Sequence, residues 1–198
     1  MWREFLENLL VEGGPIEMAS ASLYFVAALF LLLSSRGYGR NTGWPGAAIL
    51  CAGGFRELDF QYRFTSGYVL STGYFLAGTA PGWELFIVIS TLAGLLIVIT
   101  QFVTLNWSAF VDGLRHGRRF AFLVAGAVGL IFFTTSLDVL QSYLRRNYPS
   151  FTDAAFTMWV LEEMLELAIP LLFGAAVLEA AAAKSHRAAR LSPRQRAA

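Results

Sequence analysis

Long apolar runs with few polar residues dominate this chain. Residues 85–103, for example, read LFIVISTLAGLLIVITQFV without a single charge. A helix needs roughly 20 residues to cross a hydrocarbon core of about 30 Å. Four runs are that long, and we expect a shorter fifth to span as well. The expected spans are residues 15–35, 43–60, 84–105, 119–140 and 156–183. Barrel strands would alternate over about ten residues, so the pattern predicts an all-α fold, a polytopic transmembrane helical bundle.

The span count depends on residues 61–82, which are rich in aromatic residues and glycine. Because Tyr and Trp favour the headgroup level, this segment is expected to be interfacial or partly re-entrant. If it crossed the membrane, there would be six spans and both chain ends would share a side. Residues 1–14 show the spacing of an interfacial amphipathic helix. Residues 15–183 form the bundle, and residues 184–198 are a basic cytoplasmic tail, expected to lie disordered against anionic headgroups.

Composition agrees with a membrane protein. With 56% hydrophobic and 15% charged residues and a mean hydropathy of +0.54, the chain is too apolar for a soluble domain. A net charge of +1, without a basic stripe outside the tail, gives no footprint for a nucleic acid. The expected partner is the lipid bilayer. Cys51 is the only cysteine, so an intrachain disulfide is excluded.

Basic residues set the expected orientation, because cytoplasmic loops are enriched in Lys and Arg. With five spans, ten of the fifteen basic residues fall on one side and five on the other. The larger group is Arg36, Arg40, Arg115, Arg118, Arg119, Lys184, Arg187, Arg190, Arg194 and Arg196. The sequence therefore predicts an N-terminus outside and a cytoplasmic C-terminus.

The expected spans lack side chains that several familiar membrane sites require. His116 and His186 both fall in cytoplasmic basic segments, and Lys184 lies in the tail. We therefore expect no b-type haem with paired histidine ligands, no histidine-ligated zinc, no Ser-His protease and no retinal Schiff base. Asp59 and Asp138 lack the Gly-x-Gly-Asp context of intramembrane aspartyl proteases.

Acidic residues inside the expected spans are the main functional signal. A charge at mid-membrane costs about 2.5–3.5 kcal/mol even on the lenient insertion scale. Seven acids lie in or at the edge of a span, and the predicted orientation puts all of them in the outer leaflet. The predicted ion- or proton-binding residues are Glu57, Asp138, Glu162 and Glu166, with Arg56 as counter-charge and Glu17, Asp59 and Glu163 as further members.

Helical spacing groups three of these acids. Glu162, Glu163 and Glu166 populate adjoining stripes of one helix. At about 1.5 Å per residue, Glu166 lies roughly 15 Å below Phe156, near the bilayer centre. A carboxylate at that depth must be protonated, paired or bound to a metal. Pro170 lacks an N–H, which leaves the carbonyl of Glu166 without its helical donor.

The other acids have structural interpretations. Asp59 has Arg56 at i−3 and Arg63 at i+4, which predicts an ion-pair ladder at the interface. Glu57 points away from Asp59 and is expected to lack a basic partner on its own helix, which favours the bundle interior. Glu17 is either an interfacial cap or a member of the site. Two acids near span ends are expected to face headgroups, Glu84 and Glu179.

Carboxylates crowded in a low dielectric either hold protons or recruit a cation. With oxygen ligands alone, a metal in this cluster would be Ca²⁺, Mg²⁺ or Mn²⁺. An ion- or proton-binding membrane protein is the leading hypothesis. The structural alternative is a polar network that locks helices together, with Thr134, Thr135 and Ser136 as partners. Two further classes are a non-catalytic subunit or assembly factor, packed against a membrane-protein partner or a second copy, and a lipid-processing enzyme with a glutamate as general acid or base.

Three short motifs give a resemblance to a known group. They are Gly14-Pro15-Ile16-Glu17, Arg56-Glu57-Leu58-Asp59, and Leu161-Glu162-Glu163-Met164-Leu165-Glu166-Leu167. With these motifs the chain resembles a group of uncharacterised bacterial inner-membrane proteins, over most of its length. The resemblance implies a multi-span helical protein of the bacterial inner membrane and implies no activity.

Overall fold

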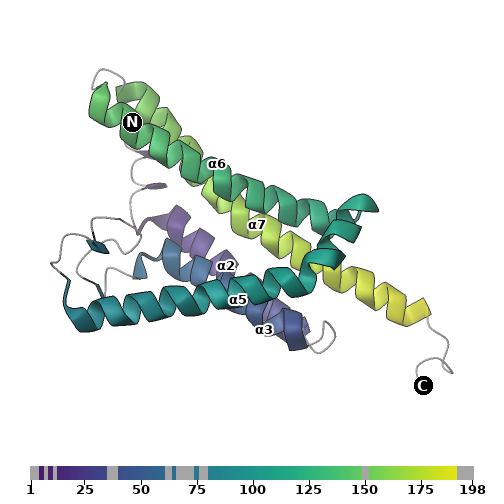
Figure 1. The fold of residues 1–198 in the computed structure, drawn as a ribbon. Helices are drawn as coiled ribbons and strands as arrows, with labels where there is room; N and C mark the ends of the chain where they lie inside the picture. Colours follow the sequence, from purple (N-terminus) through teal and green to yellow (C-terminus); the bar gives the residue numbers. More distant parts are fainter. Residues whose placement is uncertain are drawn as a thin grey trace. The chain divides into compact units, whose positions relative to one another are not determined.

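Helices make up nearly all of the described chain. The computed structural model describes residues 5–6, 9–10, 13–34, 40–60, 64–65, 74–75, 80–148 and 152–190, with the backbone alone at residues 40–42, 152 and 184–190. These residues contain no β-strand. The long helices are α2 (Pro15–Ser34), α3 (Arg40–Glu57), α5 (Gly82–Arg115), α6 (Arg119–Asn147) and α7 (Thr152–Arg190) (Figure 1). The predicted all-α fold is confirmed.

Four of these helices are long and apolar enough to cross a membrane: α2, α5, α6 and the Asp153–Ala183 part of α7. They correspond to four of the five expected spans. The remaining expected span, residues 43–60, is helical only to Glu57 and is not among the four. Its helix, α3, carries charged residues at both ends and is rich in glycine between them, which lowers its average hydropathy.

The chain divides into two compact units, Met1–Trp107 and Ser108–Ala198. In the first unit, α2 and α3 pack against each other (Figure 1). A Cβ atom built on Gly46 would meet Leu31, whereas one built on Gly53 would lie 2.9 Å from the ring of Tyr24. Since the partner number falls as the number on α3 rises, the two helices are antiparallel.

The interface between α2 and α3 is narrow because it is made of small residues. A stripe of α2 is buried, at Ser20, Ala21, Tyr24, Ala27, Ala28 and Leu31. On α3, Gly53 and Gly54 face the rings of Tyr24 and Phe25 so closely that an added Cβ would stand 2.9 Å from each ring. The absence of side chains at these two glycines therefore lets the aromatic rings of α2 lie directly on the α3 backbone.

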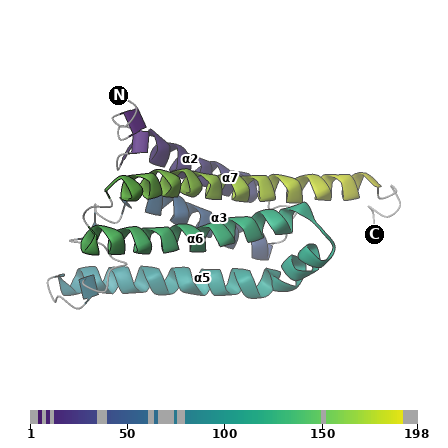
Figure 2. The ribbon, with the colours of Figure 1, turned by 90° about the horizontal axis from the view of Figure 1, so that it is seen from above.

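In the second unit, α6 and α7 also form an antiparallel pair (Figure 2). Near their connection, Gln141 Nε2 donates a buried hydrogen bond of 3.2 Å to the carbonyl of Ala155. Near the other end, Arg119 Nη1 lies 3.6 Å from Glu179 Oε1. These two contacts fix the register of the pair along most of α6.

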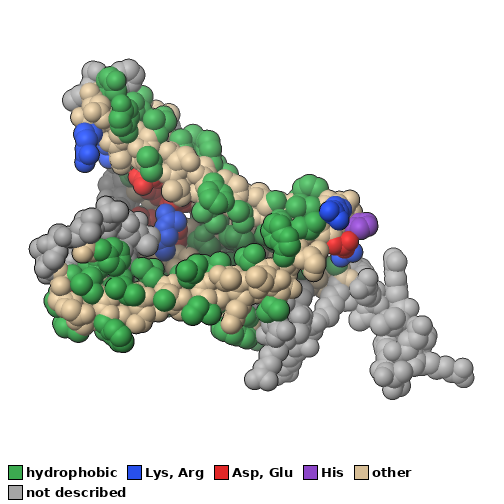
Figure 3. Space-filling view, in the orientation of Figure 1, with side chains coloured by type: hydrophobic (Ala, Val, Ile, Leu, Met, Phe, Trp, Pro, Cys, Tyr) green, Lys and Arg blue, Asp and Glu red, His purple; other side chains and the backbone are tan. Residues whose placement is uncertain are grey.

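The turn between α5 and α6 is a Schellman motif. Gly117 has φ +65°, the left-handed conformation that favours glycine. The N–H of Arg118 donates to the carbonyl of Gly113 at 2.8 Å, and the N–H of Gly117 donates to that of Leu114 at 3.2 Å. Charged side chains gather on this turn, as Figure 3 shows at one end of α6.

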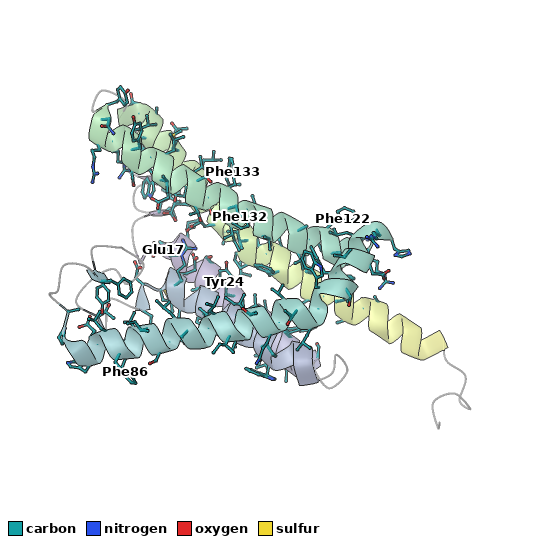
Figure 4. All side chains as sticks on the ribbon, viewed as in Figure 1. Glu17, Tyr24, Phe86, Phe122, Phe132 and Phe133 are labelled. Carbon is teal, nitrogen blue, oxygen red and sulfur yellow. The ribbon has the colours of Figure 1, made fainter. Side chains whose placement is uncertain are left out.

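Large apolar side chains cover the outside of the helices, as expected for lipid contact. The exposed phenylalanines labelled in Figure 4 are Phe86, Phe122, Phe132 and Phe133. The helix α5 is the extreme case, because only 6% of its most apolar 18-residue stretch is buried. Apolar surface of this extent is stable in a bilayer and would aggregate in water.

Two predicted segments are described only in part, and the prediction for a third segment, the basic tail, is corrected. Most of the predicted interfacial helix 1–14 and most of residues 61–82 lie outside the described residues. The basic tail was expected to be disordered from Lys184, but α7 continues to Arg190. A run of alanines before Lys184 explains this extension, since alanine has the highest helix propensity.

Candidate functional site

Glu17 caps the beginning of α2. Its Oε2 accepts a hydrogen bond of 2.6 Å from the backbone N–H of Gly13, two residues before the helix begins. Pro15 occupies the first helical position, where a missing N–H costs nothing. Figure 4 shows Glu17 on α2, nearer the start of the helix than Tyr24. The sequence allowed Glu17 to be either a helix cap or a member of the acidic site. The structure contains the contact that a cap requires.

Glu57 is the last residue of α3 and is nearly enclosed. Its side chain is 6% exposed, and its Oε1 lies 3.8 Å from Nη1 of Arg56, whose side chain is 52% exposed. The expectation that Glu57 lacks a basic partner on its own helix is therefore wrong. The two residues are neighbours at the end of α3.

Ser20 is a buried hydroxyl without a hydrogen-bond partner. Its residue is 1% exposed, and Oγ makes no hydrogen bond in the described part of the chain. It does not use the carbonyl of Ile16, four residues back, which is the usual partner of a serine within a helix. In the α2–α3 register set by Gly53 and Tyr24, Ser20 lies one turn further on, level with Glu57.

Asp59 lies beyond the end of α3 and not within a helix. Its φ is +46°, a left-handed conformation that Asp adopts more readily than most residues. Its N–H donates to the carbonyl of Arg56 at 3.0 Å, a turn that follows the end of α3. The expected ladder from Arg56 through Asp59 to Arg63 required helical spacing, which ends at Glu57; Arg63 itself lies outside the described residues.

The three carboxylates of α7 are half-buried, near the middle of the candidate span Asp153–Ala183. Trp159 Nε1 donates a hydrogen bond of 3.1 Å to Oε1 of Glu163, one turn further along α7. The Pro170 ring is fully buried four residues after Glu166. Its missing N–H leaves the Glu166 carbonyl without the usual helical donor.

Asp138 is exposed on α6. Along the α6–α7 pair it lies at a different height from Glu166. The contacts Gln141–Ala155 and Gly126–Leu172 place Asp138 opposite the Trp159 region of α7, about two turns from Glu166. The expected hydroxyl partners of the network instead bond to carbonyls of their own helix. These bonds run from Thr134 and Thr135 to Ile131 and from Ser136 to Phe132.

Taken by unit, the predicted acids form separate groups. Glu17, Glu57 and Asp59 belong to the first unit, and Asp138, Glu162, Glu163 and Glu166 to the second. Within the described residues, no group of three or more His, Cys, Asp or Glu side chains has the geometry to hold a metal ion.

The structure adds one buried acidic pair that sequence reasoning missed. Tyr74 Oη donates a hydrogen bond of 2.7 Å to Glu84 Oε1, and the two residues are 7% and 4% exposed. Glu84 was expected to face headgroups, so that expectation is wrong. Val88 completes this cluster, with Leu85 packed against it. Tyr74 lies outside α5, which begins at Gly82, so no helical spacing within one element links it to Glu84 and the sequence carried no signal for the pair.

Burial and the adjacent carboxylate change the acidity of Tyr74. Burial of the phenol, followed by its hydrogen bond to Glu84, raises the pKa of Tyr74 to about 12 from an ordinary value of 10.0. The phenol therefore stays protonated at physiological pH and acts as a donor. It supplies the partner that a buried carboxylate at the beginning of α5 requires.

A second set of charges pairs on the α5–α6 turn. Asp112 lies 3.0 Å from Nδ1 of His116 through one oxygen and 3.0 Å from Nη2 of Arg118 through the other. All three side chains are about half exposed or more. Glu179, expected to face headgroups, pairs with Arg119 across the α6–α7 interface at 3.6 Å. Exposed pairs of this kind contribute little to stability.

The chain was compared with protein-family models, with curated proteins and with solved structures, and none of the three comparisons gives a match. The resemblance to bacterial inner-membrane proteins stays a prediction.

Proposed function

We propose that the chain is a membrane-spanning protein that binds protons or a divalent cation through carboxylates of its helices. The proposed binding residues are Glu57, with Arg56 as counter-charge, in the first unit, and Asp138, Glu162 and Glu166 in the second. The observation that carries this proposal is the position of Glu166. It lies half-buried near the middle of a candidate span, together with Glu162 and Glu163.

Depth supplies the physical reason. The candidate span Asp153–Ala183 begins thirteen residues before Glu166, about 20 Å along the helix axis. An ionised carboxylate at this depth is costly unless it is compensated, so Glu166 is expected to hold a proton, pair with another side chain or share a cation. Glu163 already accepts a hydrogen bond from Trp159, and the carbonyl of Glu166 is free of its helical donor because of Pro170. These oxygen atoms are the available ligands.

The proposed topology has five spans, with the N-terminus outside and the C-terminus in the cytoplasm of a bacterial inner membrane. The support for α3 as a span is its length and pairing. Its 18 residues extend about 27 Å, and it runs antiparallel to α2 over most of that length. A helix that lies along a span from end to end crosses the same thickness of bilayer.

Thermal melts of the purified protein test the proposal at Glu166. The three samples are wild type, Glu166→Gln, and the matched control Glu179→Gln on the same helix. A bound divalent cation should raise the melting temperature of wild type and of the control by about 5–10 °C at about 100 times its dissociation constant. The same cation should leave Glu166→Gln unchanged. If the ligand is a proton, lowering the pH in EDTA should reproduce this difference between Glu166→Gln and the other two samples.

Equal responses in all three samples would contradict the proposal. In that case Glu166 belongs to a packing network, and Glu166→Leu should lower stability by about 1 kcal/mol, the scale of polar contacts between membrane helices. The control is appropriate because Glu179 pairs with Arg119 near the end of α7, where its loss has little effect.

The second candidate, a subunit of a larger membrane complex, is favoured by the surface of α5. This helix is an apolar candidate span, yet it is nearly unburied. One exposed stripe along it is small or polar at Ser90, Gly94, Gln101 and Thr104. A carboxamide such as Gln101 in a lipid-facing span gains from a hydrogen-bonding partner helix. Gln101→Leu should then reduce co-purification of a stoichiometric partner, while Val103→Leu, on the opposite face, should not.

A further inference from the structure

We propose that the α5–α6 turn, residues 112–119, and the end of α7, residues 180–190, together bind the phosphate of an anionic phospholipid. Both segments belong to the second unit, Ser108–Ala198. The inference goes beyond the proposed function, because it involves none of the carboxylates proposed to bind protons or a cation. It uses only the length and apolar character of the helices that could cross a membrane.

Basic side chains outnumber acidic ones on the α5–α6 turn. Four of its residues are basic and exposed: Arg115, His116, Arg118 and Arg119 (Figure 3). Asp112 lies 3.0 Å from both His116 and Arg118, and Glu179 of α7 lies 3.6 Å from Arg119. Among the described residues, Arg115 makes no ion pair. Three arginines thus face two carboxylates, which leaves an excess of positive charge on the surface of the turn.

The end of α7 brings further basic residues to the same end of the unit. The contact between Arg119 and Glu179 aligns the beginning of α6 with Glu179 of the antiparallel α7. From Glu179, α7 continues to Arg190, about 16 Å further and past the beginning of α6 (Figure 2). This stretch of helical backbone contains Lys184, Arg187 and Arg190 and no acidic residue. Basic residues from two distant parts of the sequence therefore gather at one end of the α6–α7 pair.

The turn lies at the depth of the lipid phosphates when α6 crosses a membrane. The apolar sequence of this candidate span begins at Phe120, directly after Arg119. Phe122 is 56% exposed and so is available to acyl chains. Arg118 and Arg119 therefore lie within about one helical turn, roughly 5 Å, of the hydrocarbon. The headgroup layer extends about 5–8 Å beyond the hydrocarbon on each side of a bilayer, so a guanidinium at this position reaches it.

The chemistry of these side chains fits a lipid phosphate. A guanidinium is planar, stays charged and can donate two parallel hydrogen bonds to phosphate oxygens. The positive end of the α6 dipole lies at the turn and adds to the same field. Asp112 would repel a phosphate, but both of its oxygens already pair with basic partners. A zwitterionic lipid carries its own cation and gains little from this excess of positive charge, so the site favours an anionic headgroup.

Lipid titrations of the full-length protein in detergent test this site. The melting temperature is followed against the concentration of phosphatidylglycerol, of phosphatidylcholine with the same acyl chains, and of inorganic phosphate. Wild type should be stabilised by phosphatidylglycerol and much less by the other two. The double variant Arg115→Gln, Arg119→Gln should bind phosphatidylglycerol about 30-fold more weakly, the equivalent of about 1 kcal/mol for each arginine. Arg115→Lys keeps the charge and should retain most of the affinity.

The double variant Arg145→Gln, Arg146→Gln is the matched control. These arginines are exposed near the other end of α6, where the negative end of the dipole disfavours an anion, so their loss should leave the affinity nearly unchanged. Lys184→Gln with Arg187→Gln tests the end of α7 and should weaken binding. Without added lipid all variants should melt like wild type, because exposed ion pairs contribute little to stability.

Four results would overturn the proposal. They are an unchanged affinity in the turn variant, an unchanged affinity in the α7 variant, equal weakening by the control, and equal stabilisation by phosphatidylcholine or inorganic phosphate. None of them changes what is expected of the melts at Glu166, so the failure of this inference and the failure of the proposed function are separate outcomes.

Discussion

The phenolic oxygen of Tyr74 lies 2.7 Å from Oε1 of Glu84, and this hydrogen bond attaches the residues before α5 to the first turn of that helix. Both side chains are buried beside Val88. A carboxylate in the first turn is also favoured by the helix dipole, and the N–H of Glu84 itself bonds to the carbonyl of Pro81 at 3.0 Å. The beginning of α5 is therefore held by side chain and backbone together.

Loss of the phenol should weaken this attachment. Tyr74→Phe keeps the ring but leaves the buried Glu84 without one donor, so the melting temperature should fall by about 2–4 °C, the scale of one hydrogen bond in a chain of this size. Tyr143→Phe is the control, because Tyr143 is exposed and the same oxygen is removed. Equal melting of the two variants would show that the Tyr74 hydroxyl does not stabilise the fold.

Alkaline pH should remove the same stabilisation. The pKa of Tyr74 is about 12 in the folded chain and near 10.0 in the unfolded chain. Below pH 10 both states hold the proton, so the contribution is complete. Between pH 10 and about 12 only the unfolded state ionises, so stability falls as the pH rises. Denaturation measured across this window should show a steeper loss in wild type than in Tyr74→Phe; parallel curves would contradict the assignment.

Two glycine-to-alanine substitutions should differ in the size of their effect on stability. In Gly53→Ala the new methyl would lie 2.9 Å from the Tyr24 ring, so α2 and α3 must separate, at a cost of about 1–3 kcal/mol. In Gly94→Ala the methyl meets nothing within 4 Å, and stability should stay within about 0.5 kcal/mol of wild type. Detergent denaturation measures both. A neutral Gly53→Ala would show that the α2–α3 contact is looser than described.

Cysteine labelling can count the spans. In a background with Cys51 replaced by serine, single cysteines at Gly13, His116 and Asn147 are labelled in intact cells by a reagent that does not cross the membrane. The five-span topology predicts labelling at Gly13 and Asn147 from outside and none at His116. With four or six spans, Gly13 and Asn147 would lie on opposite sides. His116 and Asn147 lie at the ends of α5 and α6, where a substitution should disturb folding little, whereas Gly13 has a φ of +75°, so the folding of that variant is checked by its thermal melt.

Hydropathy was sufficient to predict the helices, and the reason is physical. In lipid a backbone must satisfy its own hydrogen bonds, so a long apolar run has one available conformation. The expected span 119–140 lies within α6, and 15–35 differs from α2 by one residue. The errors fall at the ends. Helices α5 and α7 extend beyond the apolar runs because amphipathic and alanine-rich residues continue a helix after hydropathy has fallen.

Side-chain partners were harder to predict than helices. Periodicity treats residues 56–63 as one helix, whereas α3 ends at Glu57 and Asp59 has a φ of +46°. The pair Tyr74–Glu84 joins the first turn of α5 to a residue outside that helix, which no periodic pattern specifies. The unbonded hydroxyl of Ser20 is also invisible in sequence, since a serine four residues after an isoleucine carbonyl would be expected to bond to it.

The close contact between α2 and α3 has a consequence for biogenesis. Taken alone, α3 is a poor substrate for the insertion machinery, because its charges and glycines make partition into lipid unfavourable. Its favourable surface exists only once α2 is present, since Gly53 and Gly54 are complementary to the rings of Tyr24 and Phe25. In the five-span topology proposed above, the two helices would enter the bilayer as a hairpin, with α2 retained near the translocon until α3 has been synthesised. The order of synthesis, and not hydropathy alone, would decide whether α3 reaches the membrane.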